Sequence, residues 1–560
     1  MRILRHCSIL ILLILLPLGV QASDLEKTWV FFTDKGPSLQ KAEWHALEQQ
    51  LSERARWRRA KVYDDRPMVD MTDVPVHVDY LQALQELNLE PLVVSKWLNA
   101  VSVYASPQDV QRIEQWPFVE RTQPVARAQR RPVGDAPPSL EKFHSGAQSF
   151  AFDYGKSFDQ NAQIMVPELH SLGITGKNVL VAVFDTGFTL EHEAFDGINI
   201  VDTYDFINND DNVDNEPGDH SAQNSHGTKV LSILAGFAEG HLIGPAFDAD
   251  FLLAKTEDVS SETQVEEDNW IAAAEWAEQL GAEIITSSLG YIDWYEYEDM
   301  DGRTAPITLA ADMAVDKGVV VVTSAGNEGD NSWYYITAPA DGFDVIAVGA
   351  VTSTGSIAGF SSRGPTADGR IKPEVVAMGV GNAYANPGGT NYSFGSGTSF
   401  SCPMVSGVAA LILSAHPGLT PKQVRQALIQ TASQVNQPDN VYGFGLINAL
   451  DAVNYWGSIS DPAEETKLIH AFPNPFSYAV HDQVGFLLDL KEFSPVTVEL
   501  YNILGQHMGT IVNTTLPGSK DALVFWNGVL SNGKSVLSGV YLYKVQIGSY
   551  YKTGKLTILQ

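Results

Sequence analysis

The chain has 560 residues, 44% of them hydrophobic, and its 36 basic and 67 acidic residues give a formal net charge of −31. This length exceeds what one hydrophobic core supports, so we expect a modular globular protein of about three domains. The acidic balance argues against nucleic acid or anionic lipid as a partner, because both require a basic surface.

The first 22 residues have the pattern of a secretory signal peptide. Basic residues precede an apolar run from Ile9 to Leu18, and small residues end at Ala22. The run is shorter than the roughly 20 residues of a membrane-spanning helix, and we expect no later segment to qualify, hence no transmembrane anchor. Cys7 lies inside this signal, so Cys402 has no intrachain partner and a disulfide framework is excluded.

A small α+β unit is expected over residues 23–131. It opens with an apolar strand at 27–32 and continues with helical patterns at 80–87 and 110–116, which flank a strand pattern at 98–104. Arginines and prolines follow, a composition typical of a linker. We place that linker at residues 132–152.

An α/β region is expected over residues 153–458, because short β-branched runs alternate there with helical patterns. This alternation is typical of a mostly parallel sheet flanked by helices. The expected strands are 179–184, 251–254, 284–287, 319–322 and 345–348, and the expected helices are 227–235, 270–280, 309–315 and 400–413.

The last region, residues 467–560, has the texture of an all-β domain. Short alternating strands are separated by turn pairs such as Asn532-Gly533, with no helical period. We expect an Ig-like β-sandwich.

Three residues of the α/β region have positions suited to nucleophilic catalysis. Asp185 ends an apolar strand, where open α/β sheets build their sites. His226 and Ser399 each stand at the start of an expected helix, and glycines beside Ser399 allow a sharp turn. Each residue alone also fits a commoner role, as a turn or helix cap, so their shared context has to decide.

That context is a set of four motifs in order: Asp185-Thr186-Gly187, His226-Gly227-Thr228, Ser324-Ala325-Gly326-Asn327-Glu328-Gly329 and Gly397-Thr398-Ser399. From about residue 154 to 456 the chain resembles the subtilase family, the S8 serine peptidases. The resemblance implies a subtilisin-like fold and a serine endopeptidase acting on polypeptides. Ser399 would be the nucleophile, His226 the base and Asp185 its orienting carboxylate, with Asn327 and the Ser399 N–H holding the oxyanion.

The resemblance also implies a substrate-binding surface. Ser288, Leu289 and Gly290 match the family's edge segment that pairs with an extended peptide, and Gly326 belongs to the same surface. An ordinary strand exit is the alternative for residues 288–290. Cys402 follows the serine closely and could be taken for a thiol nucleophile, but its apolar helical setting favours buried packing.

An oxygen-rich stretch lies between Asp185 and His226. Its ligands suit calcium, which many subtilases bind, although solvated turns explain the same composition equally well. We expect no required cofactor, with a structural calcium ion as a hypothesis. The stretch comprises Asp202, Asp205, Asn208 to Asp211, Asp214 to Glu216 and Asp219.

Residues 23–131 resemble a subtilase propeptide, which implies an intramolecular inhibitor removed by a cut between Arg127 and Phe152. The C-terminal region resembles the sorting domain of the type IX secretion system, which implies that machinery as a partner and export across the outer membrane to the medium or cell surface. The motifs that carry the second resemblance include Phe472-Pro473-Asn474-Pro475-Phe476 and Ser538-Gly539-Val540-Tyr541. An adhesion or substrate-binding module is the alternative for this domain.

Two competing functions remain for the whole chain. A catalytically silent, peptide-binding surface protein fits the same fold, but the intact set of catalytic residues argues against it. An esterase fits a Ser-His-Asp arrangement, but esterases usually carry serine in Gly-x-Ser-x-Gly after a strand, and Gly397-Thr398-Ser399 before a helix does not match.

Overall fold

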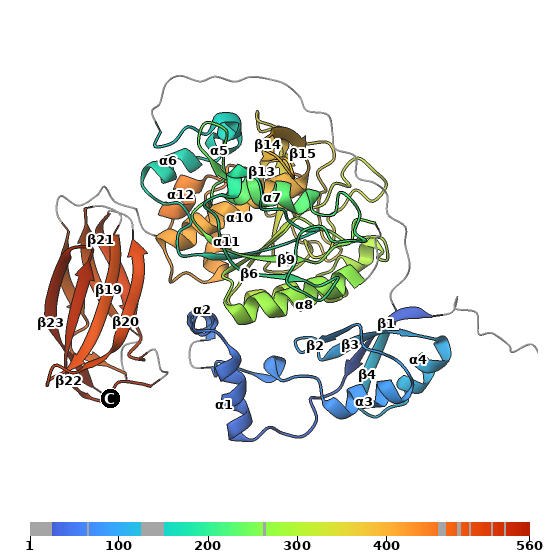
Figure 1. The fold of residues 1–560 in the computed structure, drawn as a ribbon, viewed down its shortest axis with the longest axis horizontal. Helices are drawn as coiled ribbons and strands as arrows, with labels where there is room; N and C mark the ends of the chain where they lie inside the picture. Colours follow the sequence, from blue (N-terminus) through green and yellow to red (C-terminus); the bar gives the residue numbers. More distant parts are fainter. Residues whose placement is uncertain are drawn as a thin grey trace, which may run out of the picture.

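The computed structural model describes residues 25–63, 66–124, 150–260, 265–456, 466–478, 483–491, 494–516, 519–530 and 534–559. The expected signal peptide, most of the expected linker and the pair Asn532-Gly533 lie outside the described residues. Figure 1 shows an N-terminal unit, a large central α/β unit and a C-terminal all-β unit.

A parallel seven-stranded sheet forms the centre of the α/β unit, which confirms the expected fold class. Its strand order is β13-β12-β11-β10-β5-β9-β6. The chain leaves β5 for β6 and β9 on one side and returns to β10 on the other, so the carboxyl end of β5 is a topological switch point, where such sheets place their sites. The strands are β5 Leu180–Asp185, β6 Asn199–Asp205, β9 Asp250–Lys255, β10 Ile284–Ser287, β11 Val320–Ser324, β12 Ile346–Val351 and β13 Val375–Met378.

Helices cover both faces of this sheet, which explains why its inner strands are mostly apolar, whereas the edge strand β6 is largely polar. Val181 and Val183 of β5 share a core with the helices on one face, and Ala182 and Phe184 share a core with those on the other. The first face carries α7 Ser225–Ala235, α10 Thr398–Ala415, α11 Pro421–Gln430 and α12 Ala449–Asn454, and the second carries α8 Val265–Leu280 and α9 Pro306–Asp316. Smaller elements are α5 Phe158–Ala162, α6 Val166–Ser171, β7 Phe237–Ala238, β8 Leu242–Ile243, β14 Val380–Ala385 and β15 Tyr392–Ser396.

Helix α10 corrects one expectation. Its 18 residues are long and apolar enough to cross a membrane by length and composition, although no such later segment was expected. However, 94% of that stretch is buried inside the protein, so the helix serves as the core of the α/β unit.

The N-terminal unit contains an antiparallel sheet of order β2-β3-β1-β4 that lies against the α/β unit. Trp29 and Phe31 on one face of β1 join the core formed with α8 and α9, while Val30 and Phe32 on the other face pack in a separate core. The sheet is therefore sandwiched between its own helices and those of the α/β unit. Its elements are β1 Glu26–Phe32, α3 Val78–Glu86, β2 Val93–Ser95, β3 Ala100–Ala105, α4 Pro107–Ile113 and β4 Val119–Pro124.

Two further helices of the N-terminal unit were not expected from the sequence. Helices α1 (Lys41–Gln50) and α2 (Glu53–Tyr63) follow β1, and we call them the helical arm. Figure 1 shows α2 beside one end of α8, apart from the four-stranded sheet. Two of the buried side chains of α2 are the charged Arg58 and Arg59. Because the buried face of α2 is not apolar, its sequence has no hydrophobic period from which a helix could be predicted.

The C-terminal unit consists of two sheets around one apolar core, in agreement with the expected all-β class. Their strand orders are β16-β18-β21 and β17-β23-β22-β19-β20. The strands are β16 Lys467–Phe472, β17 Phe476–Ser477, β18 Val484–Leu490, β19 Ser494–Asn502, β20 His507–Leu516, β21 Ser519–Trp526, β22 Gly539–Ile547 and β23 Tyr550–Leu559. The finer Ig-like assignment stays a prediction.

Candidate active site

An aspartate and a histidine meet at the switch point of the central sheet. Asp185 is the last residue of β5 and is fully buried, and His226 is the second residue of α7. Asp185 Oδ1 lies 2.7 Å from His226 Nδ1 and also accepts the backbone N–H of Thr186 at 2.7 Å. The Asp185 contact places the imidazole proton on Nδ1, which leaves Nε2 as the ring nitrogen able to accept a proton.

Close packing between α7 and the end of β5 brings these two side chains together. A β-carbon at Gly227 would lie 2.3 Å from the carbonyl oxygen of Gly187, so only glycine permits this approach. Two threonines tie the segments together as well: Thr186 Oγ1 accepts the N–H of Gly227, and Thr228 Oγ1 accepts the N–H of Thr189.

The serine of the site begins the buried helix α10. Ser399 is the second residue of that helix, and its hydroxyl donates to the carbonyl oxygen of Ser288 at 3.1 Å. The Ser288 hydroxyl in turn donates to the carbonyl oxygen of Ser399 at 2.9 Å. This reciprocal pair fixes α10 to the segment that follows β10. In this structure the Ser399 hydroxyl thus donates its hydrogen bond to a backbone carbonyl oxygen and not to the imidazole of His226.

Two N–H donors border a common space beside Ser399. A β-carbon at Gly397 would lie 3.7 Å from the backbone nitrogen of Ser399 and 3.8 Å from Asn327 Nδ2. Asn327 Oδ1 accepts both the N–H and the hydroxyl of Thr398, each at 2.9 Å, which directs the amide N–H₂ group toward that space. The missing side chain of Gly397 keeps the space open.

The expected substrate-binding residues flank one buried threonine. A β-carbon at Gly290 would lie 2.2 Å from Thr337 Oγ1, and one at Gly326 would lie 2.7 Å from Thr337 Cγ2. The backbone of Leu289 is fixed to β11, because its carbonyl oxygen accepts a hydrogen bond from the Ser324 hydroxyl. Thr337 therefore fills the gap between the segments that contain Ser288 to Gly290 and Gly326.

Electrostatics at His226 favour the protonated ring. Burial lowers the pKa of His226, but the Asp185 carboxylate and its hydrogen bond raise it by more, so the pKa lies above 6.5. Cys402 behaves differently: it is fully buried, and that burial raises the pKa of its thiol to about 11. A buried, protonated thiol is a packing group and not a nucleophile.

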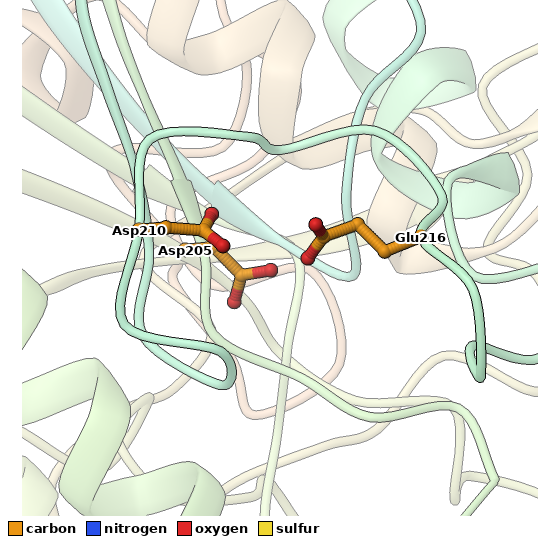
Figure 2. A group of neighbouring side chains, drawn as sticks. All are labelled: Asp205, Asp210 and Glu216. Carbon is orange, nitrogen blue, oxygen red and sulfur yellow. The ribbon is translucent and has the colours of Figure 1, made fainter.

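A group of three carboxylates lies in the oxygen-rich stretch (Figure 2). Asp205, Asp210 and Glu216 each place an oxygen within 4.8 Å of the others, the kind of ligand that calcium prefers. Asp205 already has a cation, however, because the fully buried Lys255 Nζ lies 2.8 Å from its Oδ2. Asn208 also bridges the group, donating to Asp205 and to Glu216.

The structure thus brings together Asp185 and His226 by a direct contact, and Ser399 and Asn327 around a shared space. Sequence reasoning missed Thr337 and Lys255. Thr337 lies outside every recognised motif, so nothing in the sequence pointed to its role. Lys255 stands at a strand end, and a lysine there is usually exposed to solvent.

Two family models and several known proteins are similar to this chain. The model of the subtilase family matches residues 176–445, and that of the peptidase S8 propeptide domain of Bacteroidota matches residues 27–136. Subtilisin E of Bacillus subtilis is 37% identical over 302 residues, which cover 53% of this chain and 72% of that protein. A subtilisin of Bacillus pumilus is 37% identical over 290 residues, or 51% of this chain and 95% of that protein. An alkaline protease of Alkalihalobacillus alcalophilus is 28% identical over 384 residues, or 68% and 86% of the two chains.

Proposed function

Because this chain belongs to the subtilase family of serine peptidases and carries an S8 propeptide domain, we propose that it is a secreted endopeptidase made as an autoinhibited zymogen. Ser399, His226 and Asp185 form its catalytic triad. The 2.7 Å contact between His226 Nδ1 and Asp185 Oδ1, at the switch point of the sheet, carries this proposal. This contact leaves His226 Nε2 free to accept a proton, and a serine nucleophile requires such a base.

In the proposed reaction, the Ser399 hydroxyl leaves its resting hydrogen bond to Ser288 and attacks the scissile carbonyl carbon. His226 Nε2 takes the hydroxyl proton, and Asp185 stabilises the imidazolium that forms. When the peptide C–N bond breaks, His226 returns the proton to the leaving amine, and an ester on Ser399 remains. A water molecule then repeats the sequence and releases the acid.

The negative oxygen of each tetrahedral intermediate would bind in the space beside Gly397. Asn327 Nδ2 and the Ser399 N–H both border that space, and such preorganised donors act most strongly where water is excluded. The two donors are held in place before substrate binds. Asn327 is fixed by its two hydrogen bonds from Thr398, and the Ser399 N–H by the start of α10.

Fluorophosphonate labelling of the wild-type protein tests the proposal, because only an activated serine reacts. After removal of the N-terminal segment the protein should label and should hydrolyse peptides. An unlabelled protein would favour the alternative, a silent peptide-binding protein on a subtilase fold.

Thr337 gives the proposed substrate pocket a shallow floor. Its side chain occupies the gap between Gly290 and Gly326, the two glycines of the expected binding segments. We expect a preference for small side chains on the residue that precedes the scissile bond. Thr337→Ala should raise kcat/KM for phenylalanine relative to alanine at that position by about 10- to 200-fold. Competition between paired peptides measures the ratio, and an unchanged ratio would place the pocket elsewhere.

The raised pKa of His226 sets the acid limit of activity. The imidazole accepts a proton only when neutral, so kcat/KM should rise with pH through a midpoint above 6.5. Asp185→Asn removes the charge that raises this pKa and should move the midpoint downward, in addition to slowing the reaction. A pH profile of kcat/KM for both proteins checks the direction, and a midpoint that stays in place would exclude Asp185 as its cause.

Calcium remains a proposal for the group of Asp205, Asp210 and Glu216. The oxygen ligands fit the ion, and a bound ion would stabilise the loop before His226. Lys255 pairs with Asp205 and Asp219, but its single positive charge offsets only part of the negative charge of this group. A chelator should lower the melting temperature if calcium is bound, whereas an unchanged temperature would leave Lys255 as the resident cation.

For the C-terminal unit we propose sorting through the type IX secretion system, on the sequence motifs that it contains. Its two sheets share one apolar core, which fits a module that folds separately from the peptidase unit. Deletion of residues 471–560 separates the alternatives. Retention in the periplasm would support sorting, and normal export with weaker substrate capture would support a binding module.

A further inference from the structure

The helical arm inserts one arginine between the ends of two helices of the peptidase unit. Arg58 is fully buried on α2. Its guanidinium donates to the carbonyl oxygens of Glu278 at 3.1 Å and Ala282 at 2.6 Å, at the end of α8, and to that of Lys317 at 3.2 Å, at the end of α9. Carbonyls at helix C-termini have no partner within their own helix. One side chain of the arm therefore caps both helices.

The neighbouring arginine joins the arm to the peptidase unit through carboxylates. Arg59, also fully buried, donates to both oxygens of Asp73, at 2.9 and 2.7 Å, within the N-terminal unit. Its Nε and Nη2 donate to the two oxygens of Glu278 on α8, at 2.8 and 2.7 Å. Glu278 is itself fully buried and also pairs with Arg58. Lys317 completes the group at 3.1 Å from Asp73.

The arm brings two buried positive charges to the ends of α8 and α9. Arg58, Arg59 and Lys317 supply three positive charges, and Glu278 and Asp73 supply two negative charges. The remaining positive charge faces two helix C-termini, each equivalent to about half a negative charge. Buried charges of this kind are costly unless they are paired and hydrogen-bonded. The peptidase surface at the ends of α8 and α9 thus matches a cationic helical partner.

We propose that the helical arm is a second anchor, which keeps the prosegment on the peptidase unit after the linker has been cut. This inference rests on the proposed role of the N-terminal unit as a prosegment. The four-stranded sheet is the first anchor and packs on α8 and α9 through apolar side chains such as Trp29 and Phe31. The arm holds different atoms, the helix ends and Glu278, through charge. One cut in the linker would therefore leave two independent attachments.

The experiment uses the full chain with Ser399→Ala, which prevents self-cleavage and makes the readout independent of activity. The recognition sequence of a site-specific protease replaces residues 135–140, and the linker is then cut. Dissociation of the severed prosegment is followed by size-exclusion chromatography and by fluorescence of a dye on the prosegment. If the peptidase proposal fails, this binding measurement still stands.

Arg58→Ala and Arg59→Ala should each speed dissociation by about thirtyfold or more, because each leaves buried partners unpaired. Arg56→Ala is the matched control: it lies on the same helix, but its guanidinium donates to Glu48 O inside the arm. The prosegment with Arg56→Ala should dissociate at the same rate as the prosegment without this substitution. Equal rates for all three variants would overturn the second anchor.

If an arginine variant fails to fold, hydrogen exchange on the cut complex with both arginines intact tests the second anchor instead. Amides of α2 that remain protected as long as those of β1 support the anchor. Amides of α2 that exchange freely while β1 stays protected overturn it.

Discussion

Replacing Ser399 by alanine is expected to lower kcat by about 10⁶, the magnitude known for the same change in another subtilase. The variant lacks the oxygen that forms the acyl-enzyme, and no neighbouring group can substitute for it: the Ser288 hydroxyl is engaged with the Ser399 carbonyl, and Cys402 is buried. Single-turnover kinetics with an ester substrate should show no burst, and fluorophosphonate labelling should vanish.

The fold of this variant should survive. The lost hydroxyl makes one hydrogen bond, to the Ser288 carbonyl, and such a bond contributes about 1 kcal/mol to stability. Ser401→Ala is the matched control, because Ser401 lies two residues further along α10 and its hydroxyl donates to the Thr398 carbonyl. That variant should still be labelled. Labelling that persists in Ser399→Ala and disappears in Ser401→Ala would show that Ser399 is not the nucleophile.

Replacing Asn327 by alanine is expected to lower kcat by about 10² to 10³ with little change in KM, again a magnitude known from this family. The amide N–H₂ borders the space beside Ser399 only because Asn327 Oδ1 is held by the N–H and hydroxyl of Thr398. The donor acts on charge that develops in the transition state, so its loss slows the chemical step more than it weakens substrate binding. Steady-state kinetics on one peptide series measure kcat and KM separately.

Two further variants separate donation from packing at this position. Asn327→Asp keeps an oxygen for Thr398 but has no N–H to offer, so it should be at least as slow as Asn327→Ala. Gly397→Ala leaves both donors in place and puts a methyl group within 4 Å of each, so it should also slow the reaction. A rate near wild type in Asn327→Asp would show that this residue only supports the loop.

Much of the fold could be predicted because its elements follow simple periods. Strand β10 has the predicted bounds, and α7 and α10 extend beyond the predicted helices by at most two residues at either end. The inner strands of the parallel sheet are mostly apolar and stand out from their surroundings, whereas the polar edge strand β6 was not predicted. The helical arm could not be predicted, because Arg58 and Arg59 are buried by pairing with distant groups such as Glu278.

The site was predictable in its motif residues and not in their contacts. Local sequence placed Asp185 at a strand end and His226 at a helix start, but their contact spans 41 residues of chain. The role of Thr337 depends on two glycines that precede it in the chain and meet it only in the folded protein. Long-range packing of this kind leaves no trace in local composition. The boundaries of the linker and of the C-terminal unit stay predictions.

Because the N-terminal sheet shares a core with α8 and α9, the proposed maturation would change the exterior of the enzyme. Trp29 and Phe31 currently cover apolar side chains of the peptidase unit, and Lys27 pairs with the buried Asp268 of α8. Once the prosegment departs, that mixed apolar and anionic face becomes outer surface for the first time. An antibody raised against the α8–α9 face would therefore recognise the mature enzyme alone, and could report in living cultures where and when the precursor is converted.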